Sequence, residues 1–268
     1  MKMKINKNNF LENGYIKFEE LIPRDLIKKI KLNSLKLIKN QAGNDLKKQI
    51  STGSMISISK KEAEIFVELI EYKKILKSIN QLGFNDVRWS SGYIISKPPK
   101  SPALYWHNDW WAWNDPISYI TKPSMIFVML YLDKTTVKNG SLRVIPGSHI
   151  NYNETHKILK KHHSKYRLYK NSNDPVFQKT KDEINIFSNP GDIIIGDARI
   201  LHAAHANNSK SKRTVITLWY YPDYKNLPAR IKSSAEHKWP SEWSSESREK
   251  LKKYFPNYKG KAKKIEWE

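Results

Sequence analysis

The chain has 268 residues, with 48 Lys and Arg against 26 Asp and Glu, a formal net charge of +22, and no cysteine. The length suits one domain with a hydrophobic core, and an apolar content of 39% excludes wholesale disorder. The absence of cysteine excludes a disulfide scaffold and any Cys-ligated zinc or iron–sulfur site. The longest apolar run, Met125–Leu132, is too short to span a bilayer, and no secretory signal is recognisable, so we expect a soluble cytoplasmic protein.

The high positive charge raises the question of nucleic-acid binding. Only eight of the 48 cations are Arg, and the Lys residues are spread from Lys2 to Lys264 without a dominant cluster. Arg is the residue of bidentate phosphate and guanine recognition, whereas Lys is a hydrated point charge. We interpret the charge as a lysine-biased composition and expect no nucleic-acid partner.

Helical patterns dominate the N-terminal third of the chain. Apolar residues at helical spacing predict one helix from Pro23 to about Asn40 and another over Lys60–Leu82. The intervening segment Gln49–Ser59 is consistent with a loop or a short strand.

Short apolar runs separated by Pro, Gly, Asn and Asp follow, and they predict strands without alternating helices. The expected strands are Val87–Ser96, Met125–Leu132, Leu142–Ile145, Asp192–Gly196, Ile200–His205 and Thr214–Tyr221. Residues 150–185 are predicted to form a long excursion, and Ser244–Tyr254 a helix. The fold class is therefore mainly β with flanking helices, a sandwich or barrel. We expect a single domain over 1–268, with a helical flank at about 1–86, a barrel at about 87–222 and a polar C-terminal tail at about 223–268.

A candidate metal site begins at His107 and Asp109. Residues two apart in an extended segment point to the same face, so this imidazole and carboxylate can converge on one ion. Trp110, Trp111 and Trp113 follow directly and are candidates for a wall of the substrate pocket, although tryptophans in such groups more often serve packing.

A second segment supplies the remaining candidates. A Pro-Gly-Asp turn precedes an apolar strand, and His202 follows this strand. Arg213 lies eleven residues after His202. Two His and one carboxylate form the facial triad of non-haem Fe(II) oxygenases, yet zinc or manganese can use the same three ligands. An Arg at the base of a strand suits a carboxylate-bearing cosubstrate, which it can grip bidentately. His205 competes with His202 as the distal ligand, and the spacing to Arg213 favours His202.

Several neighbouring polar residues have both structural and functional interpretations. His149 is expected to satisfy backbone groups of a turn, and Asp197 either to orient His202 or Arg213 or to stabilise a turn. Arg143 and Arg199 are expected either to line the pocket or to lie on a solvated strand face.

Taken in order, these motifs resemble the phytanoyl-CoA dioxygenase family of Fe(II)- and 2-oxoglutarate-dependent oxygenases. The resemblance rests on His107-x-Asp109, Pro-Gly-Asp at 190–192, His202, Arg213 and the segment 139–149, Asn-Gly-Ser-Leu-Arg-Val-Ile-Pro-Gly-Ser-His. It covers roughly residues 8 to 222.

The resemblance implies a double-stranded β-helix, a jelly-roll barrel of the cupin type. It also implies that His107, Asp109 and His202 bind Fe(II), and that Arg213 binds the distal carboxylate of 2-oxoglutarate. Some members carry a Ser or Thr two residues after the distal His that also contacts the cosubstrate, and this chain has Ala204 there. Thr217 or Tyr93 is a candidate for the missing hydroxyl.

The expected activity is hydroxylation of an unactivated C–H bond of a small polar or anionic metabolite, with consumption of O2 and release of succinate and CO2. Desaturation or ring formation by the same chemistry stays open. One alternative is a cupin-like zinc or manganese protein, either an isomerase or a binding protein, and the other is a basic nucleic-acid-binding protein. The oligomeric state does not follow from the sequence.

Overall fold

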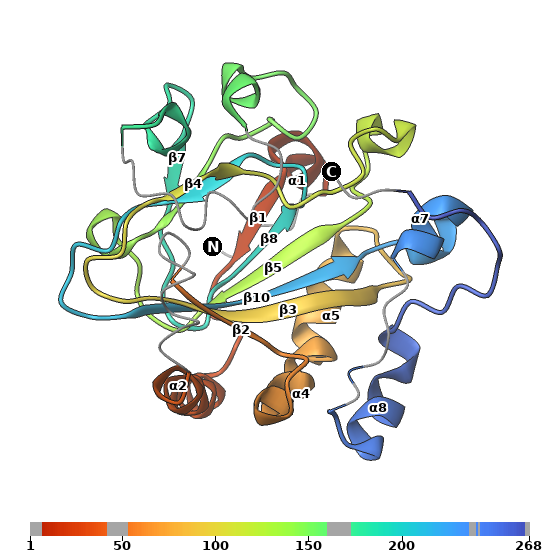
Figure 1. The fold of residues 1–268 in the computed structure, drawn as a ribbon, viewed down its shortest axis with the longest axis horizontal. Helices are drawn as coiled ribbons and strands as arrows, with labels where there is room; N and C mark the ends of the chain where they lie inside the picture. Colours follow the sequence, from red (N-terminus) through yellow and green to blue (C-terminus); the bar gives the residue numbers. More distant parts are fainter. Residues whose placement is uncertain (1–6, 42–52, 160–172, 236–239, 241, 266–268) are drawn as a thin grey trace.

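Two antiparallel β-sheets form the centre of the computed structural model, which describes residues 7–41, 53–159, 173–235, 240 and 242–265 (Figure 1). The larger sheet has six strands, in the order β1 (Tyr15–Phe18), β8 (Ile193–Asp197), β5 (Ile126–Tyr131), β10 (Arg213–Tyr221), β3 (Arg88–Lys97) and β2 (Ser54–Ser57). The smaller sheet has four, in the order β4 (Leu104–His107), β9 (His202–Ala204), β6 (Leu142–Val144) and β7 (Ile184–Ile186).

The larger sheet is covered on both faces, which explains why its central strand β5 is a continuous apolar run. All six residues of β5 are buried. Phe127, Met129 and Tyr131 belong to a core shared with Leu142 and Val144 of the smaller sheet. The alternate residues of β5 belong to a second core that includes the helices. A strand that is buried on both faces does not need the alternation of polar and apolar residues that a half-exposed strand shows.

Most of the helices pack against the outer face of the larger sheet, whereas α7 (Ala229–Ser234) packs in a separate cluster with Trp110 and Trp111 (Figure 1). The α-helices are α1 (Lys7–Asn13), α2 (Arg24–Lys39), α4 (Val67–Ile70), α5 (Lys73–Gln81), α7 (Ala229–Ser234) and α8 (Ser245–Leu251). Short 3₁₀ helices are η1 (Lys61–Phe66), η2 (Pro116–Tyr119), η3 (Val137–Asn139), η4 (Glu154–Ile158), η5 (Pro175–Phe177), η6 (Tyr224–Asn226) and η7 (Lys252–Tyr254). Buried Ile27, Ile30, Ile75 and Ile79 anchor α2 and α5.

The predicted fold class, mainly β with flanking helices in a jelly-roll arrangement, is confirmed. The predicted helix at 60–82 is wrong in its continuity: it is divided into η1, α4 and α5, and Tyr72 interrupts it with an extended ψ of 115°. The strands β1, β4 and β7 were not predicted as strands, since three or four residues carry too little periodicity.

The C-terminal segment, expected to be a polar tail, contributes to the helix-side core. Trp243 stacks on Trp89 with ring centroids 5.5 Å apart, and Leu251 and Phe255 are buried beside them. The four lysines between positions 259 and 264 are exposed, as a solvated segment would be. Of the expected excursion at 150–185, residues 160–172 lie outside the described residues. Within the described ranges, no helix combines the length and apolarity needed to cross a membrane.

Candidate metal and cosubstrate site

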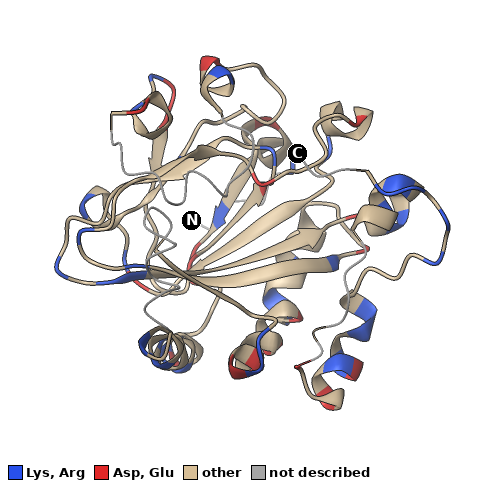
Figure 2. Ribbon diagram, viewed as in Figure 1, with Lys and Arg blue, Asp and Glu red and all other residues tan. Residues whose placement is uncertain are grey.

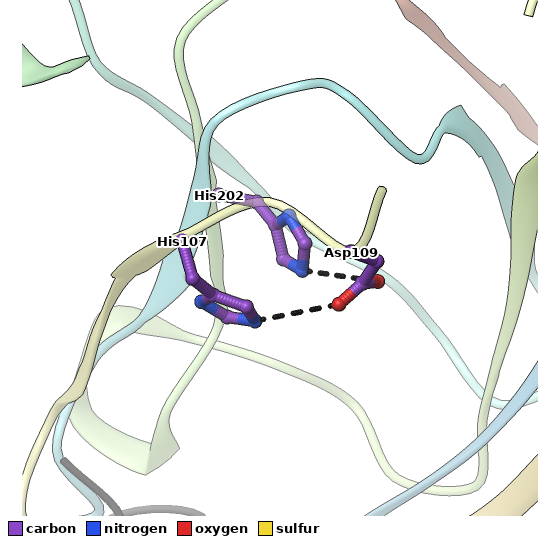
Figure 3. A group of neighbouring side chains, drawn as sticks. All are labelled: His107, Asp109 and His202. Carbon is purple, nitrogen blue, oxygen red and sulfur yellow. Dashed lines mark ion pairs between the residues drawn. The ribbon is translucent and has the colours of Figure 1, made fainter. Parts of the chain in front are cut away.

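The predicted ligands His107, Asp109 and His202 meet at one point between the two sheets (Figure 3). His107 ends β4 and His202 begins β9, and the two residues are direct partners in the smaller sheet. One ligand atom from each of the three side chains lies within 4.8 Å of the others. The Nε2 atoms of His107 and His202 lie 3.8 and 3.6 Å from the two Asp109 carboxylate oxygens.

Backbone contacts determine which imidazole nitrogen can bind a metal. His107 Nδ1 lies 2.9 Å from the carbonyl oxygen of Tyr105, and His202 Nδ1 lies 3.1 Å from that of Ile200. A carbonyl only accepts, so each Nδ1 donates its N–H there, which leaves the Nε2 of each ring, on the Asp109 side, as the nitrogen available to a metal. Two imidazole nitrogens and a carboxylate that converge in this way can bind one cation. The donor set therefore fits a divalent metal such as Fe(II), and zinc or manganese equally by ligand type.

Two contacts fix the position of Asp109. Its backbone N–H donates to the Ala198 carbonyl at 2.7 Å, which ties the loop that carries Asp109 to the turn before β9. The indole Nε1–H of Trp219 donates to Asp109 Oδ2 at 2.9 Å. We did not predict this role for Trp219. Its alternation with Arg213 and Thr217 along one strand was the available signal, because residues two apart share a face.

The ligands border a cavity of about 210 Å³, whose floor is the inner face of the larger sheet. The register of β3 and β10 arranges this floor in successive cross-strand pairs. From the metal end, these pairs are Ser91–Trp219, Tyr93–Thr217, Ile95–Val215 and Lys97–Arg213. Arg213 precedes Trp219 by six residues in β10, so the backbones of these two residues are about 20 Å apart at 3.4 Å per residue. Trp219 is the one that contacts Asp109.

Arg213, the predicted cosubstrate anchor, lies at the far end of this cavity and is only 3% exposed. Its guanidinium carbon is 5.7 Å from the centroid of the Tyr131 ring. Within the described part of the chain, its Nε has no hydrogen-bond partner. Burial lowers its pKa, while Tyr131 and Asp133 act in the opposite direction.

A second buried cation was missed at the same end. Lys97 is 1% exposed and lines the cavity opposite Arg213. The expected strand stopped at Ser96, one residue short, so the face occupied by position 97 was not assigned. Burial, and secondarily the charge of Arg213, hold the pKa of Lys97 well below its ordinary value of 10.5.

The two candidate hydroxyls are cross-strand neighbours in the middle of the cavity floor. Thr217 and Tyr93 both line the cavity. Thr217 Oγ1 is buried and, among the described residues, lacks a hydrogen-bond partner. The Tyr93 ring packs edge-on against Trp219, with centroids 6.0 Å apart. Ala204 also lines the cavity and offers no hydroxyl.

The three candidate pocket tryptophans separate in the structure. Trp111 lines the cavity. Trp110 is buried outside the cavity lining and donates to Ser118 Oγ at 2.7 Å, while Trp113 donates to Asn108 Oδ1 at 2.9 Å. Of the three, Trp111 alone borders the cavity.

The neighbouring polar residues have structural contacts. Asp197 and Arg199, each about 2% exposed, form a buried ion pair at 2.6 Å. Asp197 also accepts from the Arg199 backbone N–H, so the turn interpretation of Asp197 holds. Arg199 is buried and lies outside the cavity lining, so both earlier interpretations of it are wrong.

Arg143, His149 and His205 also lie outside the cavity lining. Arg143 is buried in an ion pair with Glu183, so both earlier interpretations of it are wrong. The Nε2 atom of His205 is 2.6 Å from Asn185 Oδ1. His149 Nε2 donates to the Leu11 carbonyl at 2.9 Å.

Comparisons with known proteins agree with this geometry. The family model of phytanoyl-CoA dioxygenase (PhyH) matches residues 10–215. A curated relative from Stutzerimonas stutzeri, a probable alpha-ketoglutarate-dependent hypophosphite dioxygenase, is 20% identical over 225 residues, covering 80% of this chain and 77% of the relative.

Solved structures share the fold. EctD from S. alaskensis, solved with 2-oxoglutarate and 5-hydroxyectoine, has a TM-score of 0.59 and 19% identity, covering 84% of this chain and 79% of that chain. The alpha ketoglutarate dependent carbocyclase SnoK from nogalamycin biosynthesis has a TM-score of 0.60 and 18% identity, covering 82% and 83%. The family model matches most of this chain, and the structure assembles the triad. The chain therefore belongs to the phytanoyl-CoA dioxygenase family of Fe(II)- and 2-oxoglutarate-dependent oxygenases.

Proposed function

We propose that this protein hydroxylates an unactivated C–H bond of a small polar metabolite, using Fe(II), 2-oxoglutarate and O2 and releasing succinate and CO2. The observation that carries the proposal is the convergence of two Nε2 lone pairs and the Asp109 carboxylate within 4.8 Å, at a cavity whose far end holds Arg213. When bound, the iron and its cosubstrate supply the oxidising chemistry, and the protein supplies binding and orientation.

The chain's own residues then have distinct tasks. His107, Asp109 and His202 hold the metal on one side, leaving the cavity side open for cosubstrate and O2. Arg213 binds the distal carboxylate bidentately. Thr217 and Tyr93, on the floor between these ends, are placed to donate to the cosubstrate and so to replace the hydroxyl that Ala204 lacks.

The size and lining of the cavity favour a small substrate. About 210 Å³ is below the usual range for drug-sized ligands, which argues against enclosing an acyl-CoA. Ser90, Ser91 and Trp111 line the cavity together with methionines. The cations in the lining, Lys97 and Arg213, lie at the end opposite the triad, so a polar substrate fits better than an anionic one.

The surface charge does not favour the nucleic-acid alternative. Figure 2 shows Lys and Arg dispersed over the outer helices and loops with Asp and Glu among them. Buried cations inside the cavity cannot contact a polyanion.

The test is Fe(II)-dependent conversion of 2-oxoglutarate to succinate by the purified protein. We expect turnover in the wild type and loss of it in Asp109→Ala, with Asp25→Ala as the control because that side chain is 99% exposed on α2. Full activity of Asp109→Ala contradicts the proposal. If the metal-loaded protein instead fails to bind 2-oxoglutarate, the zinc or manganese alternative is favoured.

A further inference from the structure

We propose that Lys97 and Arg213 together form a two-cation anchor for the distal carboxylate of 2-oxoglutarate. The proposal deepens the proposed function and rests on it. It assigns Lys97 as a binding residue that determines which 2-oxo acid the protein accepts.

The two side chains occupy the same end of the cavity. Lys97 and Arg213 are direct partners in the antiparallel pairing of β3 and β10, and both line the cavity. Both also approach the turn at Gly140: a Cβ placed on this glycine would lie 3.5 Å from Lys97 Cδ and 3.6 Å from Arg213 Nη2. With φ at +94°, Gly140 adopts a conformation that other residues rarely reach. The turn therefore packs against both side chains.

Placing two buried cations opposite each other costs free energy. Like charges directly across a sheet are destabilising, and burial increases their repulsion. Burial lowers the pKa of both groups, and the charge of Arg213 lowers the pKa of Lys97 further. Asp133 is the carboxylate that acts on Arg213, but it also accepts from Lys31 at 2.6 Å and from the Thr214 backbone N–H. A bound carboxylate relieves the repulsion by contacting both cations at once.

A structural role alone explains Lys97 less well. Its ammonium donates to the Pro102 carbonyl, which fixes the loop after β3. An ammonium group has three N–H donors, so this contact is compatible with a carboxylate on the same nitrogen. A loop contact alone would not require a charge in the lining of an otherwise largely apolar cavity.

The experiment compares two 2-oxo acids that share the chelating end. In 2-oxopentanoate, a methyl group replaces the distal carboxylate of 2-oxoglutarate without changing the chain length. Anaerobic titration of the Fe(II)-loaded protein by calorimetry gives the affinity of each, without depending on turnover. For Lys97→Met we expect the affinity for 2-oxoglutarate to fall by a factor of about 10 or more, because the loss of a hydrogen bond to a charged group weakens binding by roughly this factor. The affinity for 2-oxopentanoate should change less than about threefold.

Two further variants complete the test. Lys97→Arg keeps the charge and should retain most of the preference for 2-oxoglutarate. Lys138→Met removes an exposed lysine beside the same turn and should behave as wild type. Thermal unfolding checks that each variant is folded, and Lys97→Gln replaces Lys97→Met if the latter is not.

The outcomes separate the two proposals. Equal weakening of both acids in Lys97→Met, or no weakening of either, overturns the anchor and leaves the proposed function standing. Failure of the wild type to bind 2-oxoglutarate in the presence of Fe(II) overturns the proposed function itself, and the anchor with it.

Discussion

The hydrogen bond from Trp219 to Asp109 makes a quantitative prediction about the metal site. Trp219→Phe keeps an aromatic ring against Tyr93 but removes the N–H that donates to Asp109 Oδ2 at 2.9 Å. A hydrogen bond to a charged group contributes about 1.5–3 kcal/mol, and 1.4 kcal/mol corresponds to a factor of ten. Fe(II) should therefore bind about 10- to 100-fold more weakly, in the range typical for residues that orient metal ligands.

The measurement is Fe(II) affinity by anaerobic competition with a chelator of known affinity, with succinate formation as a second readout. Trp113→Phe is the matched control, because it removes an indole N–H that donates to Asn108 Oδ1, next to the ligands but not on one. Wild-type Fe(II) affinity in Trp219→Phe, or an equal loss in Trp113→Phe, would refute the idea that this indole holds the carboxylate in place.

Three further predictions concern stability. Arg199→Met leaves the Asp197 carboxylate buried without its partner and should lower the free energy of unfolding by about 3–5 kcal/mol in urea titrations; a loss below 1 kcal/mol contradicts the pairing. Burial lowers the pKa of His149 below its ordinary 6.5, so the unfolded chain takes up the proton first and stability falls as pH drops through about 6.5. His149→Gln should flatten the dependence of Tm on pH between 7 and 5, and an unchanged slope argues otherwise. Gly196→Ala places a Cβ 2.1 Å from Phe127 Cζ and should cost about 1–3 kcal/mol of unfolding free energy, whereas wild-type Tm would show that Phe127 can move freely.

The barrel was predictable because its long strands carry unambiguous patterns. β5 is a continuous apolar run between polar boundaries, and β10 is rich in β-branched and aromatic residues. The short strands β4 and β7 depend on pairing with their neighbours, which a local pattern does not reveal. The buried role of Trp243 likewise depends on Trp89, more than 150 positions earlier in the chain.

The candidate site was predictable where the motif spacing encodes it. His107, Asp109, His202 and Arg213 follow from spacing and from the family resemblance, and the structure brings the first three together beside the cavity whose far end Arg213 lines. The contacts of Trp219 and Lys97 were missed, because they depend on cross-strand register, which the sequence leaves undetermined. A one-residue error at the end of a strand is enough to hide a buried lysine.

A crystal structure of the protein prepared anaerobically with Fe(II) and 2-oxoglutarate tests the central claim most directly. We predict that the metal is bound by His107 Nε2, His202 Nε2 and an Asp109 carboxylate oxygen. The distal carboxylate of 2-oxoglutarate should lie within hydrogen-bond distance of Arg213. A metal bound elsewhere, or 2-oxoglutarate absent from this cavity, would contradict the assignment.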